Sequence, residues 1–320
     1  MLRRLFLLSL AAALVAGACT QGDDAATGET TSTAAAVATT KATPTTVASS
    51  TAVDGQSGVV VEKDLVFGSY NGVAMTLDLY LPAEPSGAPI VVEPPFPDDL
   101  AEAGAIVVGN VEGVGDPPDA DDEGARFLGD HGAHIRAQAE ATACAIRFAR
   151  GRASELGSDD PVVVVAGLSQ PGGLAAHVAL FGASLEERWE AFATTVGGPP
   201  RQVDCVVTDG STHVDVLVDT AGTYDLYVPV IEGLYGRSYQ QDLDPELQQF
   251  LASAVGSNPG LTVRLFHDPA DPAIPMTVSE DFEAALADAA YDVQLTSFTG
   301  GHNFPPKEIS FDVFMEVLDR

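Results

Sequence analysis

From residue 58 onward, the pattern of apolar and polar residues predicts an α/β domain. Continuous apolar runs at residues 89–92, 105–108 and 162–165 are typical of parallel strands that are covered on both faces. Two earlier segments, 59–61 and 75–81, are expected to pair antiparallel, because a Ser-Tyr-Asn-Gly turn lies between them at 69–72. The sheet therefore starts antiparallel and continues parallel.

Helical patterns separate the later strands. The longest helix is expected over about 124–156, and further helices over 280–290 and 309–318. Additional strands are expected at 214–218, 261–266 and 293–298. This alternation indicates a doubly wound, mostly parallel sheet, whose ligands bind at the carboxyl ends of the strands.

The first 57 residues do not follow this pattern. Two arginines and an apolar run over 5–18 are typical of a secretory signal peptide that is too short to span a membrane. The sequence Val-Ala-Gly-Ala-Cys at 15–19 resembles a bacterial lipobox, which implies lipidation of Cys19 and a lipoprotein anchored to the outer face of the membrane. Cleavage near Ala18 beside an incidental cysteine remains the alternative.

Residues 19–57 are mostly Thr, Ala, Ser and Val without periodicity, so this segment is predicted to be a disordered tether. The organisation expected from sequence is thus a signal peptide over 1–18, the tether over 19–57 and one folded domain over 58–320.

Charge narrows the choice of partners. The chain has 46 acidic and 15 basic residues, a net charge of −31, which argues against nucleic acid as a partner and suggests a salt-adapted surface. The acidic cluster at 116–123 lacks the spacing of an EF-hand and is interpreted as a solvated loop, so no metal and no cofactor are predicted. Cys144 and Cys205 form either a disulfide or two separate buried thiols.

The strongest chemical signal is the end of the apolar run at 162–165. It continues as Gly-Leu-Ser-Gln-Pro-Gly-Gly over 167–173, which predicts that Ser169 is a nucleophile on a sharp strand-to-helix turn. Pro171 stands where this turn usually has glycine, and proline is tolerated in a first helical turn. A buried strand followed by an ordinary turn is the alternative.

A serine nucleophile needs a base, and the base needs an acid. Candidates follow the last two expected strands, with Asp268 and Asp271 after 261–266 and Gly-Gly-His302 after 293–298. In this order the chain resembles the α/β-hydrolase family, especially its dienelactone-hydrolase and esterase-like branches. The resemblance implies a catalytic triad of Ser169, Asp271 and His302, with Asp268 as the alternative acid.

The oxyanion hole departs from the family pattern. The family places His-Gly after its third strand, whereas this chain has Glu93-Pro94-Pro95-Phe96 there. Because proline has no N–H, the backbone amides of Phe96 and Gln170 are the expected donors. The segment 223–260 lies where the family inserts a small cap, and Tyr224, Tyr227 and Tyr235 are interpreted either as lining the substrate pocket or as ordinary core residues.

These observations predict a serine hydrolase that cleaves a small-molecule carboxylic ester through an acyl-enzyme, without a cofactor. The alternative is a non-catalytic, surface-binding lipoprotein that has kept a hydrolase scaffold. The prolines and Glu93 at the expected oxyanion hole, together with Pro171, motivate the alternative, and the ordered Ser, Asp and His argue against it.

Overall fold

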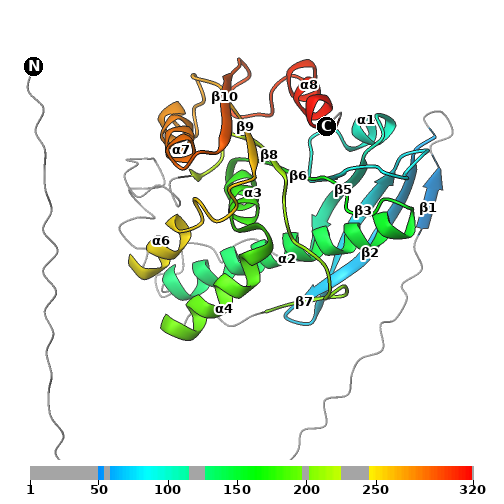
Figure 1. Cartoon of the computed structure of the whole chain (residues 1–320), viewed down its shortest axis with the longest axis horizontal. Coiled ribbons are helices and arrows are strands. Elements are labelled where there is room, and N and C mark those ends of the chain that lie inside the picture. The colour runs from blue at the N-terminus through cyan, green and yellow to red at the C-terminus, as the bar shows by residue number, and fades with distance from the viewer. Residues whose placement is uncertain (1–49, 54–57, 115–126, 197–201, 225–244, 319–320) are drawn as a thin grey trace, which may run out of the picture. The chain divides into compact units, whose positions relative to one another are not determined.

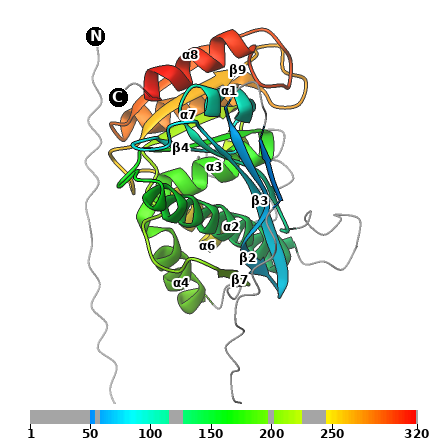
Figure 2. The same cartoon turned by 90° about the vertical axis from the view of Figure 1, so that its right-hand side faces the viewer.

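The computed structural model describes residues 50–53, 58–114, 127–196, 202–224 and 245–318. Its strands form a ten-stranded sheet with the order β1-β2-β3-β5-β4-β6-β8-β9-β10, and β7 pairs with β2 off this path. Figures 1 and 2 show the sheet between helices on its two faces. The predicted mostly parallel sheet with an antiparallel start is confirmed.

The antiparallel start is a hairpin of β2 (Val60–Tyr70) and β3 (Val73–Leu81). Asn71 and Gly72 form its turn and both have positive φ, which explains the Asn-Gly pair. A further strand, β1 (Ser50–Val53), pairs antiparallel with β2. The prediction that the tether extends to residue 57 is therefore wrong for these four residues, whose backbone forms hydrogen bonds with the edge of β2.

The parallel part contains the three apolar runs expected from sequence. β4 (Ile90–Val92) pairs in parallel with both β5 (Ile106–Glu112) and β6 (Val163–Leu168). β8 (Val216–Thr220), β9 (Thr262–His267) and β10 (Asp292–Ser297) follow in parallel. The carboxyl ends of β6, β9 and β10, after which the three candidate triad residues come, therefore point to the same edge of the sheet.

Two apolar cores cover the sheet. In β6, Val163 and Val165 face one core, while Val164 and Ala166 face the other. The first core is completed by α2 (Phe127–Glu155), α3 (Ser169–Phe181) and α7 (Met276–Asp288), and the second by α1 (Pro97–Glu102) and α8 (Lys307–Leu318). Burial on both faces is why these strands are continuous apolar runs.

Three smaller helices and one short strand complete the described fold. They are the 3-10 helix Gly182–Ser184, α4 (Leu185–Val196), α6 (Pro245–Ala252) and β7 (Val203–Cys205). A disulfide joins Cys144 of α2 to Cys205 of β7, with a Cα–Cα distance of 5.3 Å. It ties β7 to the long helix that covers the sheet. None of the described helices is long and apolar enough to cross a membrane.

Candidate active site

Ser169 lies on a sharp turn between β6 and α3. Its φ is +61°, a left-handed conformation that is uncommon for a residue with a side chain. A Cβ on Gly167 would lie 2.5 Å from the Cα of Gly172, so the strand and helix approach too closely there for any side chain. The close contact of this turn is therefore made at Gly172, and Pro171 occupies the first turn of α3 without obstructing it.

The start of α3 packs directly on the end of β8. A Cβ on Gly172 would collide with the carboxylate of Asp219, and one on Gly173 would collide with Thr223. Asp219 is fully buried and its Oδ1 accepts the Thr220 amide at 2.7 Å; burial raises its pKa. The Thr223 amide donates to the Ser169 carbonyl at 3.2 Å, which anchors the turn from the neighbouring strand end.

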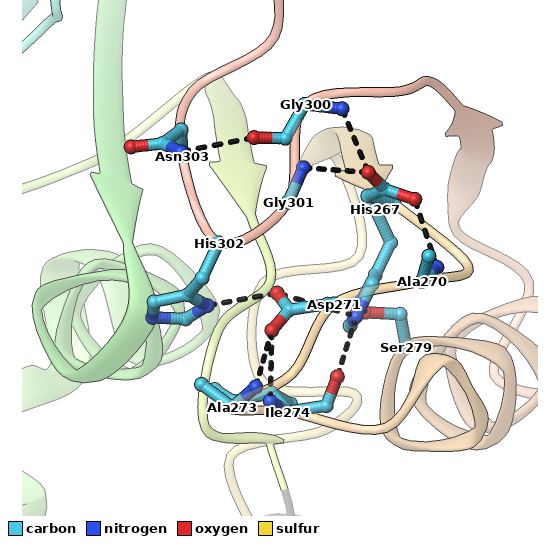
Figure 3. Close-up of polar contacts among 11 residues, drawn as sticks. His267, Ala270, Asp271, Ala273, Ile274, Ser279, Gly300, Gly301, His302 and Asn303 are labelled. Carbon is cyan, nitrogen blue, oxygen red and sulfur yellow. Dashed lines mark hydrogen bonds and ion pairs between the residues drawn. The ribbon is translucent and has the colours of Figure 1, made fainter.

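His302 and Asp271 come from different loops and contact each other. Asp271 follows β9, His302 follows β10, and His302 Nδ1 lies 2.8 Å from Asp271 Oδ2 (Figure 3). The Asp271 side chain is completely buried, while 25% of the His302 side chain is exposed. A buried carboxylate thus holds an imidazole that is partly exposed to solvent.

The electrostatics of Asp271 define the tautomer of His302. Burial raises the pKa of Asp271, but hydrogen bonds from His302 and from the amides of Ile274 and Ala273 outweigh it and leave the pKa below its usual value. The ionised carboxylate only accepts hydrogen bonds, so Nδ1 of His302 carries the proton. Nε2 is then the free acceptor, which is the atom a general base uses.

Asp268, the alternative acid, has a different task. Its Oδ2 accepts the amides of Gly300 and Gly301 at 2.7 and 2.6 Å, and its Oδ1 accepts the amide of Ala270 at 2.8 Å. These backbone hydrogen bonds lower the pKa of Asp268. Its carboxylate therefore fixes the loop that presents His302, while Asp271 is the acid that contacts the imidazole.

Solved structures similar to this chain include a truncated carbohydrate esterase from gut microbiota, with a TM-score of 0.50 and 17% identity over 80% of this chain and 96% of that one. Esterase 2 of Thermogutta terrifontis phosphonylated by cyclosarin gives 0.51 and 17%, over 80% and 90%. An acetyl ester-xyloside bifunctional hydrolase from Caldicellulosiruptor lactoaceticus gives 0.51 and 17%, over 77% and 85%. No family model and no curated protein sequence matches the chain.

The chain has the α/β-hydrolase fold. Within this α/β-hydrolase domain, His267 has a role that sequence reasoning missed. It is fully buried at the end of β9, its Nε2 donates to the Ile274 carbonyl at 2.9 Å, and its Nδ1 accepts the Ser279 hydroxyl at 2.7 Å. Ile274 lies at one end of the turn that contains Asp271. The hydrogen bond from His267 to Ile274 therefore stabilises the position of this turn. The spacing of four residues between His267 and Asp271 was the available signal.

The segment in which one oxyanion donor is expected follows β4, the strand that pairs with β6. β4 and β6 run in register, with Val92 beside Val165, so Glu93 to Phe96 continue alongside the segment that leads to Ser169. Glu93 has a φ of +55°, and the strand end is therefore bent away from extended geometry. Phe96 is the first residue before α1, and its amide donates no hydrogen bond to the described residues. This amide and that of Gln170, in the first turn of α3, have no acceptor among the residues that the structure describes.

His302 makes its hydrogen bond to Asp271, and in the described part of the chain none joins it to Ser169. Serine–histidine hydrogen bonds are often long in unliganded enzymes and tighten when substrate binds. The three side chains lie on the loops after β6, β9 and β10 at one edge of the sheet, which is what the α/β-hydrolase architecture provides.

Of the tyrosines considered for the substrate pocket, Tyr224 is a core residue. It is completely buried and stacks on Phe282 with ring centroids 4.2 Å apart, so its proposed role in lining the pocket is wrong. Tyr227, Tyr235 and the predicted lipidation site Cys19 lie outside the described residues. Within the described ranges, no three His, Cys, Asp or Glu side chains are grouped to hold a metal ion.

Proposed function

We propose that this protein is a serine hydrolase that cleaves a carboxylic ester through an acyl-enzyme. The observation that carries the proposal is the pairing of His302 with Asp271 at the edge of the sheet where Ser169 occupies a strained strand-to-helix turn. The similar structures named as esterases support the same chemistry by analogy of fold.

The proposed mechanism assigns one step to each side chain. The Ser169 hydroxyl attacks the ester carbonyl while Nε2 of His302 takes its proton, and Asp271 stabilises the imidazolium that forms. The amides of Gln170 and Phe96 hold the oxyanion, and the positive end of α3 adds to their field. His302 then protonates the leaving alcohol, and water attacks the acyl-enzyme with His302 again as base.

A fluorophosphonate probe tests this proposal on the purified protein. The probe transfers its phosphonyl group only to an activated nucleophile, so we expect one adduct per chain, mapped by peptide mass spectrometry to Ser169. A protein heated above its unfolding temperature serves as the control, because an unfolded serine is not activated. An intact protein that stays unlabelled and hydrolyses no ester is instead a binding module on a hydrolase scaffold.

Substitution of Phe96 tests the oxyanion assignment. We expect Phe96→Ala to change kcat little, because the side chain does not supply the donor. Phe96→Pro removes the N–H and should lower kcat by about 10²-fold or more. Steady-state kinetics on a p-nitrophenyl ester measure both variants, with circular dichroism to show that both are folded. Equal rates for the two would place the second donor elsewhere.

We also propose that the protein acts outside the cytoplasmic membrane, tethered by a lipid on Cys19. Support comes from the signal-like first 18 residues and from the disulfide between Cys144 and Cys205, a bond typical of oxidising compartments. The charge of −31 fits an exposed, solvated surface.

A further inference from the structure

A pocket of about 190 Å³ lies beside the nucleophile turn, between the sheet, α2 and α3. On one side it reaches Pro171, two residues after Ser169, and on the other Glu93, which ends the strand adjacent to β6. A water molecule takes roughly 30 Å³ in the liquid, so the pocket has room for a group of about six heavy atoms. The volume of the pocket therefore limits the part of an ester substrate that enters it to a short group, when the ester carbonyl lies at Ser169.

The lining combines an apolar wall with acidic and acceptor groups. Val111, Val114, Ala141, Val165, Leu174 and Ala175 form most of the wall, together with Pro171. Among the residues that the structure describes, the polar side chains of the lining are Glu93, Glu112, Gln138 and Thr142, and none of the lining residues is Lys, Arg or His. An apolar wall beside carboxylates suits an alkyl chain that carries a positive charge.

Two of these polar groups lack a partner. The Gln138 Oε1 atom is buried and accepts no hydrogen bond from the described residues. The Glu93 carboxylate receives none there either, and burial alone raises the pKa of Glu93 to about 7. An unpaired carboxylate in such a place is costly unless a cation neutralises it. The Thr142 hydroxyl donates to the Gln138 carbonyl at 3.1 Å, which leaves its oxygen as a further acceptor.

We infer that this pocket binds an alkylammonium group of the substrate, with Glu93 as the residue that determines specificity. The inference rests on the proposed function, because it places the cationic arm of an ester whose carbonyl is attacked by Ser169. The net charge of −31 acts in the same direction, since an acidic domain concentrates cations around its surface.

Matched esters test the inference, each pair differing by a quaternary nitrogen in place of a quaternary carbon. Acetylcholine and 3,3-dimethylbutyl acetate place the group in the alcohol. The p-nitrophenyl esters of 4-(trimethylammonio)butanoate and 5,5-dimethylhexanoate place it in the acyl chain. We expect kcat/KM about tenfold higher for the cationic member of at least one pair at pH 8, and a ratio within about twofold of one in Glu93→Gln.

A control variant separates the pocket from the overall charge. Glu280→Gln removes one exposed carboxylate from α7, which contributes no residue to the described pocket lining, and should leave the preference unchanged. Neutral esters should be hydrolysed at similar rates by the protein and by Glu280→Gln, and the ratio within each pair corrects for any change in rate that Glu93→Gln causes for both esters alike. Equal kcat/KM within both pairs, with the neutral esters turned over, overturns the inference and leaves the proposed function standing.

The preference should also depend on pH. Glu93 is ionised above its pKa of about 7, so the ratio of cationic to neutral kcat/KM should rise between pH 6 and pH 8. The ratio cancels any pH effect on the catalytic groups, because those groups act on both esters alike. Among the described lining residues, Glu112 is the other titratable group. α2 contributes Gln138, Ala141 and Thr142, and α3 contributes Pro171, Leu174 and Ala175, none of which titrates. A ratio independent of pH contradicts the role of Glu93.

Calorimetric titration with butyltrimethylammonium tests the pocket without turnover. Saturable binding at pH 8 that weakens about tenfold in Glu93→Gln supports the inference even for a protein that hydrolyses no ester, and then the proposed function alone fails. No saturable binding, or equal binding by Glu93→Gln, overturns it.

Discussion

Ser169→Ala is expected to lower kcat/KM for a short p-nitrophenyl ester by at least about 10⁴-fold, because it removes the atom that forms the acyl-enzyme. The side chain is partly exposed at the start of α3, and alanine is a good helix former, so the fold should be retained. Binding of substrate and the oxyanion donors remain, and they account for residual hydrolysis above the rate in water.

A second serine provides the control for this experiment. Ser253 is exposed just after α6 and donates to the Phe250 carbonyl, so Ser253→Ala should keep full activity and full labelling by the fluorophosphonate probe. Thermal unfolding of both variants shows whether the two substitutions leave stability comparable. Undiminished activity in Ser169→Ala would mean that another group is the nucleophile.

The sheet could be predicted from the sequence because strands that are buried on both faces are continuous apolar runs. The parallel strands β4, β5, β6, β8 and β9 are mostly apolar, and each predicted run starts within two residues of the start of the observed strand. The sharp turn at Ser169 could also be predicted from the sequence, because a contact as close as that between Gly167 and Gly172 permits only glycine.

The short strands β1 and β7 could not be predicted in this way, because each forms by pairing with β2 and has no apolar run of its own. β7 has three residues and forms because it pairs with β2, more than 130 positions earlier in the chain, and because Cys205 is bonded to Cys144. β1 has four residues in a Thr- and Ala-rich segment, and only the edge of β2 makes it a strand. Local composition cannot report such pairings.

Tyr224, in the predicted cap, shows that the residues lining a substrate pocket are also difficult to predict from the sequence. Tyr224 follows β8 closely enough to turn back into the core, where Phe282 of α7 stacks on it. Sequence alone could not distinguish this position from one lining a substrate pocket, because the choice depends on a helix that comes some fifty residues later. In the sequence, Glu93 only departs from the family pattern. The pocket that it lines is formed by residues of α2 and α3, which are distant from Glu93 in the chain.

The choice between Asp268 and Asp271 also depended on the structure. Both follow β9 within four residues, and either could reach a histidine after β10. The conformation of the turn decides which aspartate contacts the histidine. The Asp271 amide donates to the Asp268 carbonyl at 2.9 Å, and His267 binds the Ile274 carbonyl at the other end of the turn. Asp268 is left facing Gly300 and Gly301, and Asp271 faces the imidazole of His302.

Asp271→Asn and Asp268→Asn should therefore give different defects. We expect Asp271→Asn to lower kcat by about 10⁴-fold with little change in fold, because the amide no longer stabilises the Nδ1–H tautomer or the imidazolium. Asp268→Asn keeps the acid and base in place and should lower kcat by only about tenfold, through a less firmly held His302 loop. Steady-state kinetics on a p-nitrophenyl ester measure both.

Stability against pH supplies the second readout for this pair. Hydrogen bonds from Gly300 and Gly301 hold the folded-state pKa of Asp268 below its unfolded value of about 3.9, so its contribution to stability is present above pH 4 and is lost as the pH falls through the folded-state pKa. The Tm difference between the protein and Asp268→Asn should accordingly be largest near neutral pH and shrink below about pH 4. If Asp268→Asn instead lost activity as completely as Asp271→Asn while its Tm stayed unchanged, Asp268 would act on His302 directly and the assignment of the acid would have to be reversed.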